Sequence, residues 1–308
     1  MVIPLAASRF FGAGLGLVVD RVAGEPPTPL HPVAWFGTLM QRFENATYAD
    51  RRSAGLFYAG AGTLVAIGAG RAIRSTTAAV ALAASGRMLR STARDISQLL
   101  TAGDLAAARE ALPALVGRDP SALDESGIAA AVIESLAENT VDAVIAPALW
   151  GAALGARGAA AHRAINTMDA MVGHRSLRYR RFGTGAARLD DVAAYVPARV
   201  AVCAVCLCEP RRARSVINTV RRDAATHPSP NAGVVEAAFA AALGIELGGT
   251  LRYGARIEDR PRLGEGPRPT TADIERAISL ADRVEVVLVS ALTALGLLAW
   301  AAAKRRDA

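Results

Sequence analysis

The strongest constraint on the fold is the last apolar run of the chain. Residues 284–303 contain one charged side chain, Glu285, near the start of the run. The length of the run matches the roughly 20 apolar residues that an α-helix needs to cross the hydrocarbon core of a bilayer. The run ends in Lys304, Arg305 and Arg306, and basic residues beside a span are enriched on the cytoplasmic side. The sequence therefore predicts a membrane-spanning helix with a cytoplasmic C-terminus.

The composition of the whole chain points the same way. Hydrophobic residues make up 52% of the 308 residues without counting Gly, and charged residues only 20%. An average soluble domain has about 45–50% apolar residues with Gly included and about 25% charged ones. The mean hydropathy is +0.26, and much of the apolar content is Ala and Gly, which allow helices in lipid to approach closely. We therefore predict an all-α, polytopic integral membrane protein.

Four further apolar runs precede the last one. They cover residues 2–19, 54–70, 143–154 and 192–207. The first is expected to be a retained membrane helix, because it lacks the basic start and the cleavage site of a secretory signal. The third and fourth carry proline, and the fourth also carries Arg199. We expect these two to be buried in protein or re-entrant rather than to span the bilayer.

Two polar ranges lie between the apolar runs. Residues 87–137 begin with Arg, Asp and Glu spaced among Leu and Ala, a pattern typical of amphipathic helices. Residues 209–283 are rich in Arg, Gly and Pro. Both ranges are predicted to be soluble helical excursions within a single integral membrane domain that covers residues 1–308.

The chain is strongly basic. Its formal net charge is +7, carried by arginine, because Lys304 is the only lysine. Such an excess suits anionic lipid, a phosphorylated substrate or loops held on one side of a membrane. Nucleic acid is excluded as a partner, because no basic stretch is interleaved with aromatic residues and none of the usual binding motifs is present. Cys203, Cys206 and Cys208 lie in an apolar run without a second ligand pair, so we expect buried thiols rather than zinc ligands.

Acidic side chains next to apolar runs are the first candidates for a site. Glu134, Glu138 and Asp142 have the spacing i, i+4 and i+8, which places them on one face of a helix. Carboxylates in a row repel one another unless a cation lies among them, so this spacing indicates a divalent metal or an arginine. The alternative is the solvated face of a surface helix.

A second cluster combines an amide, a carboxylate and several arginines. Asn166 and Asp169 are followed by Gly173, His174 and Arg175, and further arginines follow at 178, 180 and 181. Oxygen ligands and guanidinium groups together suit a metal-bound phosphate. The alternative for the arginines is a loop that obeys the positive-inside bias.

A third cluster stands at the start of an apolar run. Arg188, Asp190 and Asp191 precede the run, and Arg199 lies inside it. An arginine at that depth needs a partner. An ion pair with one of the aspartates and a contact with substrate are equally open.

Two histidines are further candidates. His227 begins the string HPSPNAG, in which Ser229 and Asn231 precede an apolar run. Both residues are plausible helix caps, and a helix N-terminus can also bind an anion. His31, in the string LHPV, is either a proton acceptor or a residue of a turn.

Five separated strings together resemble the CobD/CbiB family. They are GEPPTPLHPV (24–33), ENTVDAVIAPALW (138–150), NTMDAMVGHR (166–175), RLDDVAAYVPAR (188–199) and HPSPNAG (227–233). They follow one another in matching order and span most of the chain. The family comprises membrane adenosylcobinamide-phosphate synthases of cobalamin biosynthesis.

The resemblance implies an ATP- and Mg²⁺-dependent amide ligase. It implies that a carboxylate of adenosylcobyric acid, a corrinoid, is joined to aminopropanol or aminopropanol phosphate, with an acyl phosphate as the expected intermediate. It further implies a multi-pass protein of the inner membrane, in contact with lipid, whose active site faces the cytoplasm. The oligomeric state is left open.

The resemblance also suggests roles for the candidate residues. The metal or acid–base candidates are Glu138, Asp142, Asp169, Asp190 and Asp191. The orienting amides are Asn139, Asn166 and Asn231, and the anion-binding arginines are Arg175, Arg188 and Arg199. Ser229 is assigned to substrate or phosphate binding, and His227 or His31 to accepting a proton.

Two other classes of function remain open on the residues alone. A transporter for an anionic cofactor precursor also suits polar residues at membrane depth, although the chain lacks two matching halves. A structural membrane subunit is disfavoured by the density of polar clusters.

Overall fold

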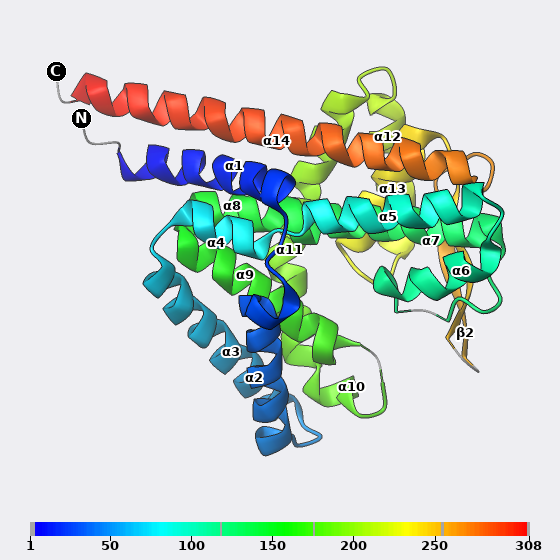
Figure 1. The fold of residues 1–308 in the computed structure, drawn as a ribbon, viewed down its shortest axis with the longest axis horizontal. Helices are drawn as coiled ribbons and strands as arrows, with labels where there is room; N and C mark the ends of the chain where they lie inside the picture. Colours follow the sequence, from blue (N-terminus) through cyan, green and yellow to red (C-terminus); the bar gives the residue numbers. More distant parts are fainter. Residues whose placement is uncertain (1–3, 118, 175, 254–255, 307–308) are drawn as a thin grey trace. The chain divides into compact units, whose positions relative to one another are not determined.

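The chain is almost wholly helical (Figure 1). The computed structural model describes residues 4–117, 119–174, 176–253 and 256–306. Within these residues the only sheet is a two-stranded antiparallel hairpin of β1 (Leu247–Tyr253) and β2 (Arg256–Leu263). The prediction of an all-α fold is therefore confirmed, with one hairpin inside the polar range 209–283.

The chain divides into two compact units. The first comprises Met1–Gly86, Asp142–Pro197 and Leu288–Ala308, and the second Arg87–Val141 and Ala198–Val287. Both predicted polar excursions, 87–137 and 209–283, lie entirely within the second unit. Two long helices, α11 (Thr184–Cys208) and α14 (Thr271–Arg306), contribute residues to both units.

The other elements are shorter. In the first unit they are α1 (Leu5–Ala23), a 3₁₀ turn (Thr28–Leu30), α2 (Pro32–Thr47), α3 (Arg52–Ile73), α4 (Thr76–Ala83), α8 (Ala146–Leu154), α9 (Ala156–Met168), a π-helical turn (Asp169–Gly173) and α10 (Tyr179–Phe182). A second π-helical turn, Val141–Ile145, precedes α8. In the second unit they are α5 (Gly86–Thr101), α6 (Leu105–Ala111), α7 (Glu125–Thr140), α12 (Ala213–Asp223), α13 (Ala232–Leu243) and 3₁₀ turns at Leu112–Ala114 and Ala224–Thr226.

Three of the described helices are long and apolar enough to cross a membrane. They are α3, α11 and α14, with 22, 25 and 36 residues. The predicted last span is thus a helix of sufficient length. Residues 5–19 of the run 2–19 are helical within α1, as predicted, but α1 is not among these three helices. In the run 143–154, residues 143–145 belong to a π-helical turn and residues 146–154 form the nine-residue α8, which by itself is too short to span at 1.5 Å per residue.

The run 192–207 belongs to one continuous helix, α11, with Pro197 in its interior. Helix α11 is long and apolar enough to span, and the expectation that this run is buried in protein or re-entrant stays a prediction. Cys203 is exposed, and Cys206 and Cys208 are half-buried, so the prediction of buried thiols is wrong. A helix in lipid turns apolar side chains outward, and an apolar neighbourhood in the sequence therefore does not imply burial in protein.

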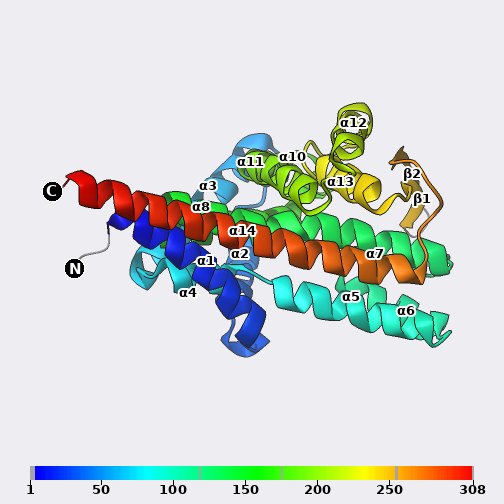
Figure 2. The same cartoon turned by 90° about the horizontal axis from the view of Figure 1, so that it is seen from above.

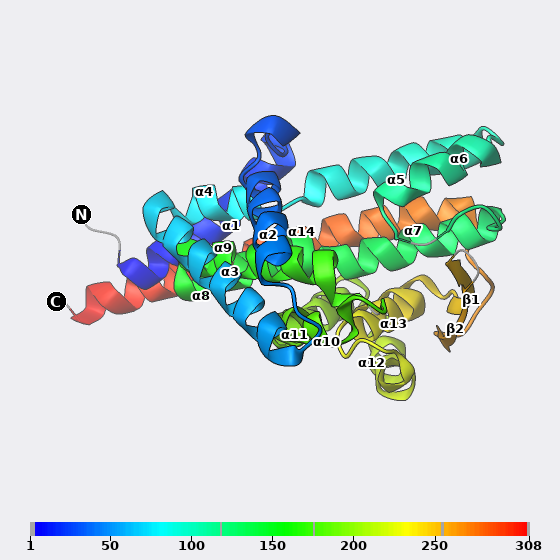
Figure 3. The same ribbon diagram turned by 90° about the horizontal axis from the view of Figure 1, so that it is seen from below.

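Glycines allow the helices of the first unit to pack closely. A Cβ at Gly16 would lie 2.7 Å from Cβ of Val80 on α4, and a Cβ at Gly12 would lie 3.0 Å from Cβ of Thr76. Such distances leave no room for a side chain, so α1 can approach α4 only through glycine. Helices α3 and α9 also run side by side (Figure 3), with Gly62 of α3 against Met168 of α9.

A buried ion pair joins two helices of the second unit. Arg90 of α5 donates from Nη1 to Oε2 of Glu285 on α14 over 2.6 Å, and its Nε lies 3.1 Å from Oδ1 of Asp282. The Arg90 and Glu285 side chains are 7% and 3% exposed. Figure 2 shows α5 beside this part of α14.

Candidate functional site

Two aspartates of the first unit converge on one amide. Asn166 of α9 donates from Nδ2 to Oδ2 of Asp142 over 3.0 Å, and the same nitrogen lies 3.5 Å from Oδ1 of Asp190 on α11. An amide nitrogen carries two N–H donors, so one group can orient both carboxylates. All three side chains are half-buried. The structure thus brings together three predicted site residues from three different motifs.

Asp142 lies in the π-helical turn before α8. Such turns are uncommon and occur frequently at functional sites. Pro147 follows and has no N–H, so it leaves the carbonyl of Ala143, four residues earlier, without its helical donor. The backbone N–H of Ser85 donates to that carbonyl over 3.0 Å. The irregular backbone beside Asp142 is therefore satisfied by the loop after α4.

A second proline allows a cross-link between α8 and α11, the helix that carries Asp190. Pro197 cannot donate to the carbonyl of Ala193, the residue four positions earlier in α11. The indole Nε1 of Trp150 donates to this carbonyl over 3.0 Å. The bond joins α8 to α11 and uses a backbone acceptor that proline has freed. Trp150 and Pro197, which belong to different motifs, thus act on the same carbonyl: Pro197 leaves it without its helical donor, and Trp150 supplies a donor.

Asp169 begins the other π-helical turn, which ends at Gly173. The Asp169 carboxylate is folded back over the Cα of Gly173, so closely that a Cβ at position 173 would overlap Oδ1. Asp169 is half-buried. Glycine at 173 therefore permits the observed orientation of this carboxylate.

We expect Gly173→Ala to lower activity far more than stability. The added methyl group must displace the Asp169 carboxylate, which is the mobile end of a short side chain, while the backbone remains in place. Activity should fall by about 10-fold or more if Asp169 has the predicted role. Turnover and the melting temperature of the purified variant check this expectation. Gly37→Ala is the control, because a Cβ there meets nothing within 4 Å.

The chain after this turn is anchored by Glu44 of α2. Oε1 of Glu44 accepts hydrogen bonds from Arg178 Nη2 over 3.0 Å and from the Tyr179 hydroxyl over 2.9 Å. The Arg178 guanidinium also lies 4.1 Å from the centre of the Tyr48 ring. Burial, together with the bond to Glu44, raises the pKa of Tyr179, and the bond to Glu44 raises the pKa of Arg178. The sequence did not suggest Glu44, which is 1% exposed.

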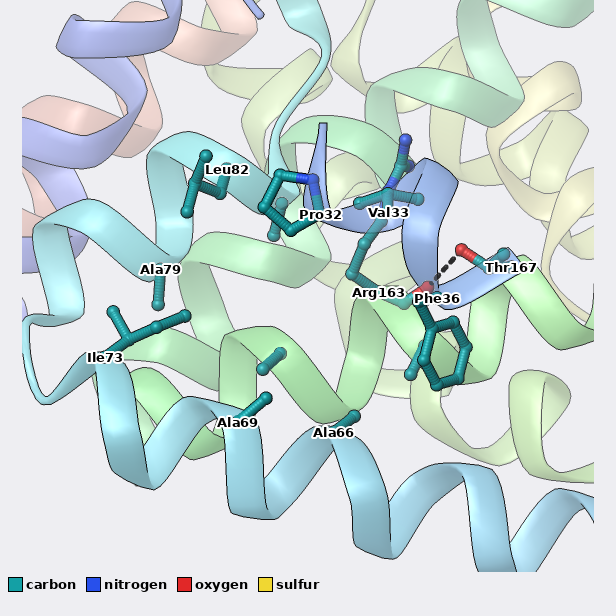
Figure 4. Close-up of a pocket in the computed structure, with 13 residues that line it drawn as sticks. Pro32, Val33, Phe36, Ala66, Ala69, Ile73, Ala79, Leu82, Arg163 and Thr167 are labelled. Atoms are coloured by element: carbon teal, nitrogen blue, oxygen red, sulfur yellow. Dashed lines mark hydrogen bonds between the residues drawn. The ribbon is translucent and has the colours of Figure 1, made fainter. Parts of the chain in front are cut away.

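Arg163 lies at an apolar cavity of about 100 Å³ between α2, α3, α4 and α9 (Figure 4). Its Nη2 donates to Oγ of Ser85 over 3.0 Å, the residue whose N–H supports the turn at Asp142. Burial lowers the pKa of Arg163, and the carboxylates of Glu25, Asp142 and Asp20 act against this. Arg163 is therefore a cation that acts electrostatically on Asp142. The sequence did not single it out.

His31 has a structural role at the start of α2. Its Nδ1 accepts a hydrogen bond from the N–H of Val33 over 3.2 Å, and its Nε2 lies 3.4 Å from Oε2 of Glu25. The side chain is 8% exposed. This geometry agrees with the interpretation of His31 as a residue of a turn, and its role as a proton acceptor stays a prediction.

The HPSPNAG string forms a compact turn in the second unit. Oγ of Ser229 accepts from the N–H groups of Asn231 and Ala232 over 3.3 and 3.2 Å at the start of α13. Asn231 is the N-cap residue of α13, but its side chain makes no capping hydrogen bond. Arg199 donates to Oδ1 of Asn231 over 2.7 Å and to the carbonyl of Pro230 over 3.1 Å. The sequence did not suggest these partners for Arg199.

His227 is oriented by its own turn. Its Nδ1 accepts from the N–H of Ser229 over 3.1 Å, and its Nε2 lies 3.8 Å from Oε1 of Glu236. An Nδ1 that accepts leaves the proton of the neutral ring on Nε2, the nitrogen that faces Glu236. The His227 and Glu236 side chains are 6% and 2% exposed. Both ring nitrogens thus face groups of the protein.

The remaining predicted residues lie in different surroundings. Glu134 is buried and accepts from the N–H of Gly248 over 2.9 Å, whereas Glu138, one turn later in α7, is exposed. Glu134 and Glu138 thus lie one turn apart in the same helix but in different surroundings, and a cation among the acidic residues stays a prediction. Asn139 donates to the Ser135 carbonyl over 3.0 Å. Arg188 is exposed and Asp191 half-buried on α11, and Arg175 lies outside the described residues.

Asp142 and Asp190 of the first unit supply carboxylate oxygens, the donor type that Mg²⁺ prefers. Among the residues that the structure describes, no three His, Cys, Asp or Glu side chains form a group that could hold a metal ion. Mg²⁺ commonly binds through one or two carboxylates and takes its other ligands from water and substrate phosphates. The convergence of Asp142 and Asp190 on Asn166 offers two such carboxylates.

Comparison with known proteins gives a consistent family. A family model described as CobD/Cbib protein matches residues 13–281. The cobalamin biosynthesis protein CobD of Mycobacterium tuberculosis is 45% identical over 291 residues, which cover 90% of this chain and 93% of that protein. The protein of the same name from Chromobacterium violaceum is 41% identical over 286 residues, covering 87% and 91%.

A further relative extends the similarity to another group of bacteria. The cobalamin biosynthesis protein CobD of Rhodobacter capsulatus is 39% identical over 273 residues, covering 81% of this chain and 84% of the relative. No solved structure matches the chain. Identity of this extent over nearly the full length, with a family model that spans most of the sequence, shows that the chain belongs to the CobD/CbiB family of cobalamin biosynthesis proteins.

Proposed function

We propose that the protein is an ATP-dependent amide ligase that makes adenosylcobinamide or its phosphate. It would join a carboxyl group of adenosylcobyric acid to the amino group of aminopropanol or aminopropanol phosphate. The observation that carries the proposal is the convergence of Asp142 and Asp190 on Asn166, because this geometry suits a divalent cation and a bound phosphate. The family membership supports the place of the reaction in cobalamin biosynthesis.

The chemistry requires activation of the carboxylate. A carboxylate does not condense with an amine unaided, so the corrinoid carboxylate oxygen attacks the γ-phosphorus of ATP and displaces ADP, which gives an acyl phosphate. The amine nitrogen then attacks the carbonyl carbon, inorganic phosphate leaves, and the nitrogen loses a proton. One ATP is consumed for each amide formed, and the atoms balance without a further reactant.

The residues of the first unit have defined roles in this scheme. Magnesium, when bound, would neutralise charge on the transferred phosphoryl group. Asp142 and Asp190 would hold the cation, and Asn166 would keep both carboxylates oriented. Asp169, held over Gly173, is a further candidate for the cation or for acid–base chemistry. His31 is the proposed general base within this unit, and His227, the other candidate, belongs to the second unit.

The same proposal covers the cellular location. The three helices that are long and apolar enough to cross a bilayer support a protein that spans the inner membrane several times. The basic end of α14, Lys304 to Arg306, favours a cytoplasmic C-terminus. ATP is a cytoplasmic substrate, and the active site is accordingly proposed to face the cytoplasm.

The decisive test is phosphate release by the detergent-purified protein. The reaction would contain ATP, Mg²⁺, adenosylcobyric acid and aminopropanol phosphate, with each component omitted in turn and the product examined by mass spectrometry. Phosphate release that needs every component, together with an amide product, is the expected result. Corrinoid binding without turnover of ATP would contradict the proposal and favour a carrier.

A further inference from the structure

The first unit contains a second cavity, whose walls are basic. It has a volume of about 430 Å³ and lies among α1, the end of α3 and the starts of α4 and α9. Four arginines line it, Arg9, Arg71, Arg74 and Arg157. The described lining contains no Asp or Glu. Among the described residues, none of these four arginines forms an ion pair.

Glycines allow the walls of this cavity to come together. A Cβ at Gly70 would lie 2.6 Å from the carbonyl oxygen of Ala156, so the end of α3 meets the start of α9 only through glycine. Gly155 has a φ of +69°, and its Cβ position lies 3.4 Å from Nε of Arg9. Arg9 in turn donates from Nη1 to the carbonyl of Ala153 over 3.0 Å. Arg9 is thus held against the loop between α8 and α9, whereas Arg71, Arg74 and Arg157 are exposed at the rim.

Helix termini of both signs meet at this cavity. Helices α4 and α9 begin at its wall, after Ser75 and Gly155, whereas α3 and α8 end there. The dipoles of starting and ending helices oppose one another. Ser75 and Thr76 add hydroxyl donors to the lining. The four guanidinium groups therefore determine the positive potential of the cavity.

The backbone at Arg74 gives an independent observation. Its φ of 60° makes it the only non-glycine residue in the described chain with a positive φ. It follows the last residue of α3 in a conformation that side chains rarely adopt. Residues in sparsely populated conformations cluster at active and ligand sites, and the Arg74 side chain lines the cavity.

We propose that this cavity binds a phosphate- or diphosphate-bearing anion. Guanidinium groups bind phosphate oxygens through paired hydrogen bonds, and the volume lies in the range of ordinary ligand pockets, about 300–1,000 Å³. Two kinds of molecule present this chemistry, a soluble phosphate ester and the headgroup of an anionic lipid. The lipid is included because α3, which ends at the cavity, is long enough to span a bilayer. The inference does not depend on the proposed reaction.

The test compares two double variants with equal loss of charge. Arg71→Gln with Arg74→Gln removes two guanidinium groups from the cavity. Arg51→Gln with Arg52→Gln removes two from the other end of α3, where both are exposed. Pyrophosphate is the soluble probe, measured by calorimetry on the full chain in a zwitterionic detergent. Nanodiscs with and without phosphatidylglycerol, followed by mass spectrometry of retained lipid, form the second arm.

The cavity variant should bind the probe from one source at least 10-fold more weakly, which corresponds to about 1.4 kcal/mol. The control variant should bind as the unaltered protein does. Loss of pyrophosphate binding assigns the soluble source, and loss of retained phosphatidylglycerol assigns the lipid. No binding of either probe, or equal loss in both variants, would overturn the proposal.

A third variant separates the side chain from the backbone. Arg74→Gly relieves the positive φ, so its melting temperature should equal or exceed that of the unaltered protein, while binding of the probe still weakens. Weaker binding in a protein of undiminished stability excludes misfolding as the cause. Undiminished binding in Arg74→Gly would show that the Arg74 side chain does not contact the anion.

Discussion

Replacing Asp142 by asparagine is expected to reduce the rate of amide synthesis by about 100-fold or more, with little change in stability. The side chain at 142 keeps its size and can still accept the hydrogen bond from Asn166 through its amide oxygen. The variant loses only the negative charge, and a divalent cation depends on that charge. Metal sites lose about 10–100-fold in affinity or activity when even an outer partner is removed. The measurement is phosphate release at saturating ATP across a range of Mg²⁺ concentrations.

Two further variants make this result interpretable. Asp95→Asn makes the same chemical change at an exposed position of α5 and should leave the rate unchanged. The exchange of Asp142→Asn together with Asn166→Asp restores one carboxylate and one amide to the pair. It should restore any lost stability without restoring activity, because the carboxylate then stands on the wrong helix. Full activity in the exchanged protein would show that only the hydrogen bond matters.

The helical class and the apolar runs could be predicted from the sequence because both depend on local hydropathy. The run 284–303 predicted its helix correctly, because a long apolar segment leaves few alternatives. For the run 192–207 the sequence did not show how the helix accommodates Pro197. Helix α11 continues through this proline, and the carbonyl of Ala193 accepts a hydrogen bond from Trp150. The partner lies 43 residues away in the chain, beyond the reach of any periodicity.

In the candidate site, too, the residues could be predicted from local sequence but their long-range contacts could not. Asp142, Asn166 and Asp190 were each identified from motifs. Their convergence could not be predicted, because Asn166 is 24 residues away in the chain from each of the two aspartates. The spacing of Glu134 and Glu138 predicted a common face, but tertiary contacts bury the first and leave the second exposed. Glu44 and Arg163 were missed, because both lie outside the five strings that carry the family resemblance. Its partner is 134 residues away for Glu44 and 78 for Arg163.

The largest expected effect on stability is at Arg90, in the second unit. Arg90→Met removes an ion-pair partner of the Glu285 carboxylate, which is 3% exposed, and methionine preserves most of the buried volume. Removing one member of a buried ion pair typically costs about 3–5 kcal/mol, because the remaining charge is left in a medium of low polarity. We therefore expect Arg90→Met to lower the melting temperature of the detergent-purified protein markedly, while α5 loses its attachment to α14.

The double variant Arg90→Met with Glu285→Leu distinguishes this cause from lost packing. Replacement of a whole buried pair by apolar side chains of similar volume is often neutral or stabilising, so the double variant should recover most of the lost stability. Asp282 is 28% exposed and can turn toward solvent, so it does not retain a buried charge. Equal melting temperatures for the single and the double variant would show instead that the methylene groups of Arg90, rather than its charge, hold α5 on α14. A thermal melt of both variants beside Arg94→Met, an exposed position on the same helix, decides between the two.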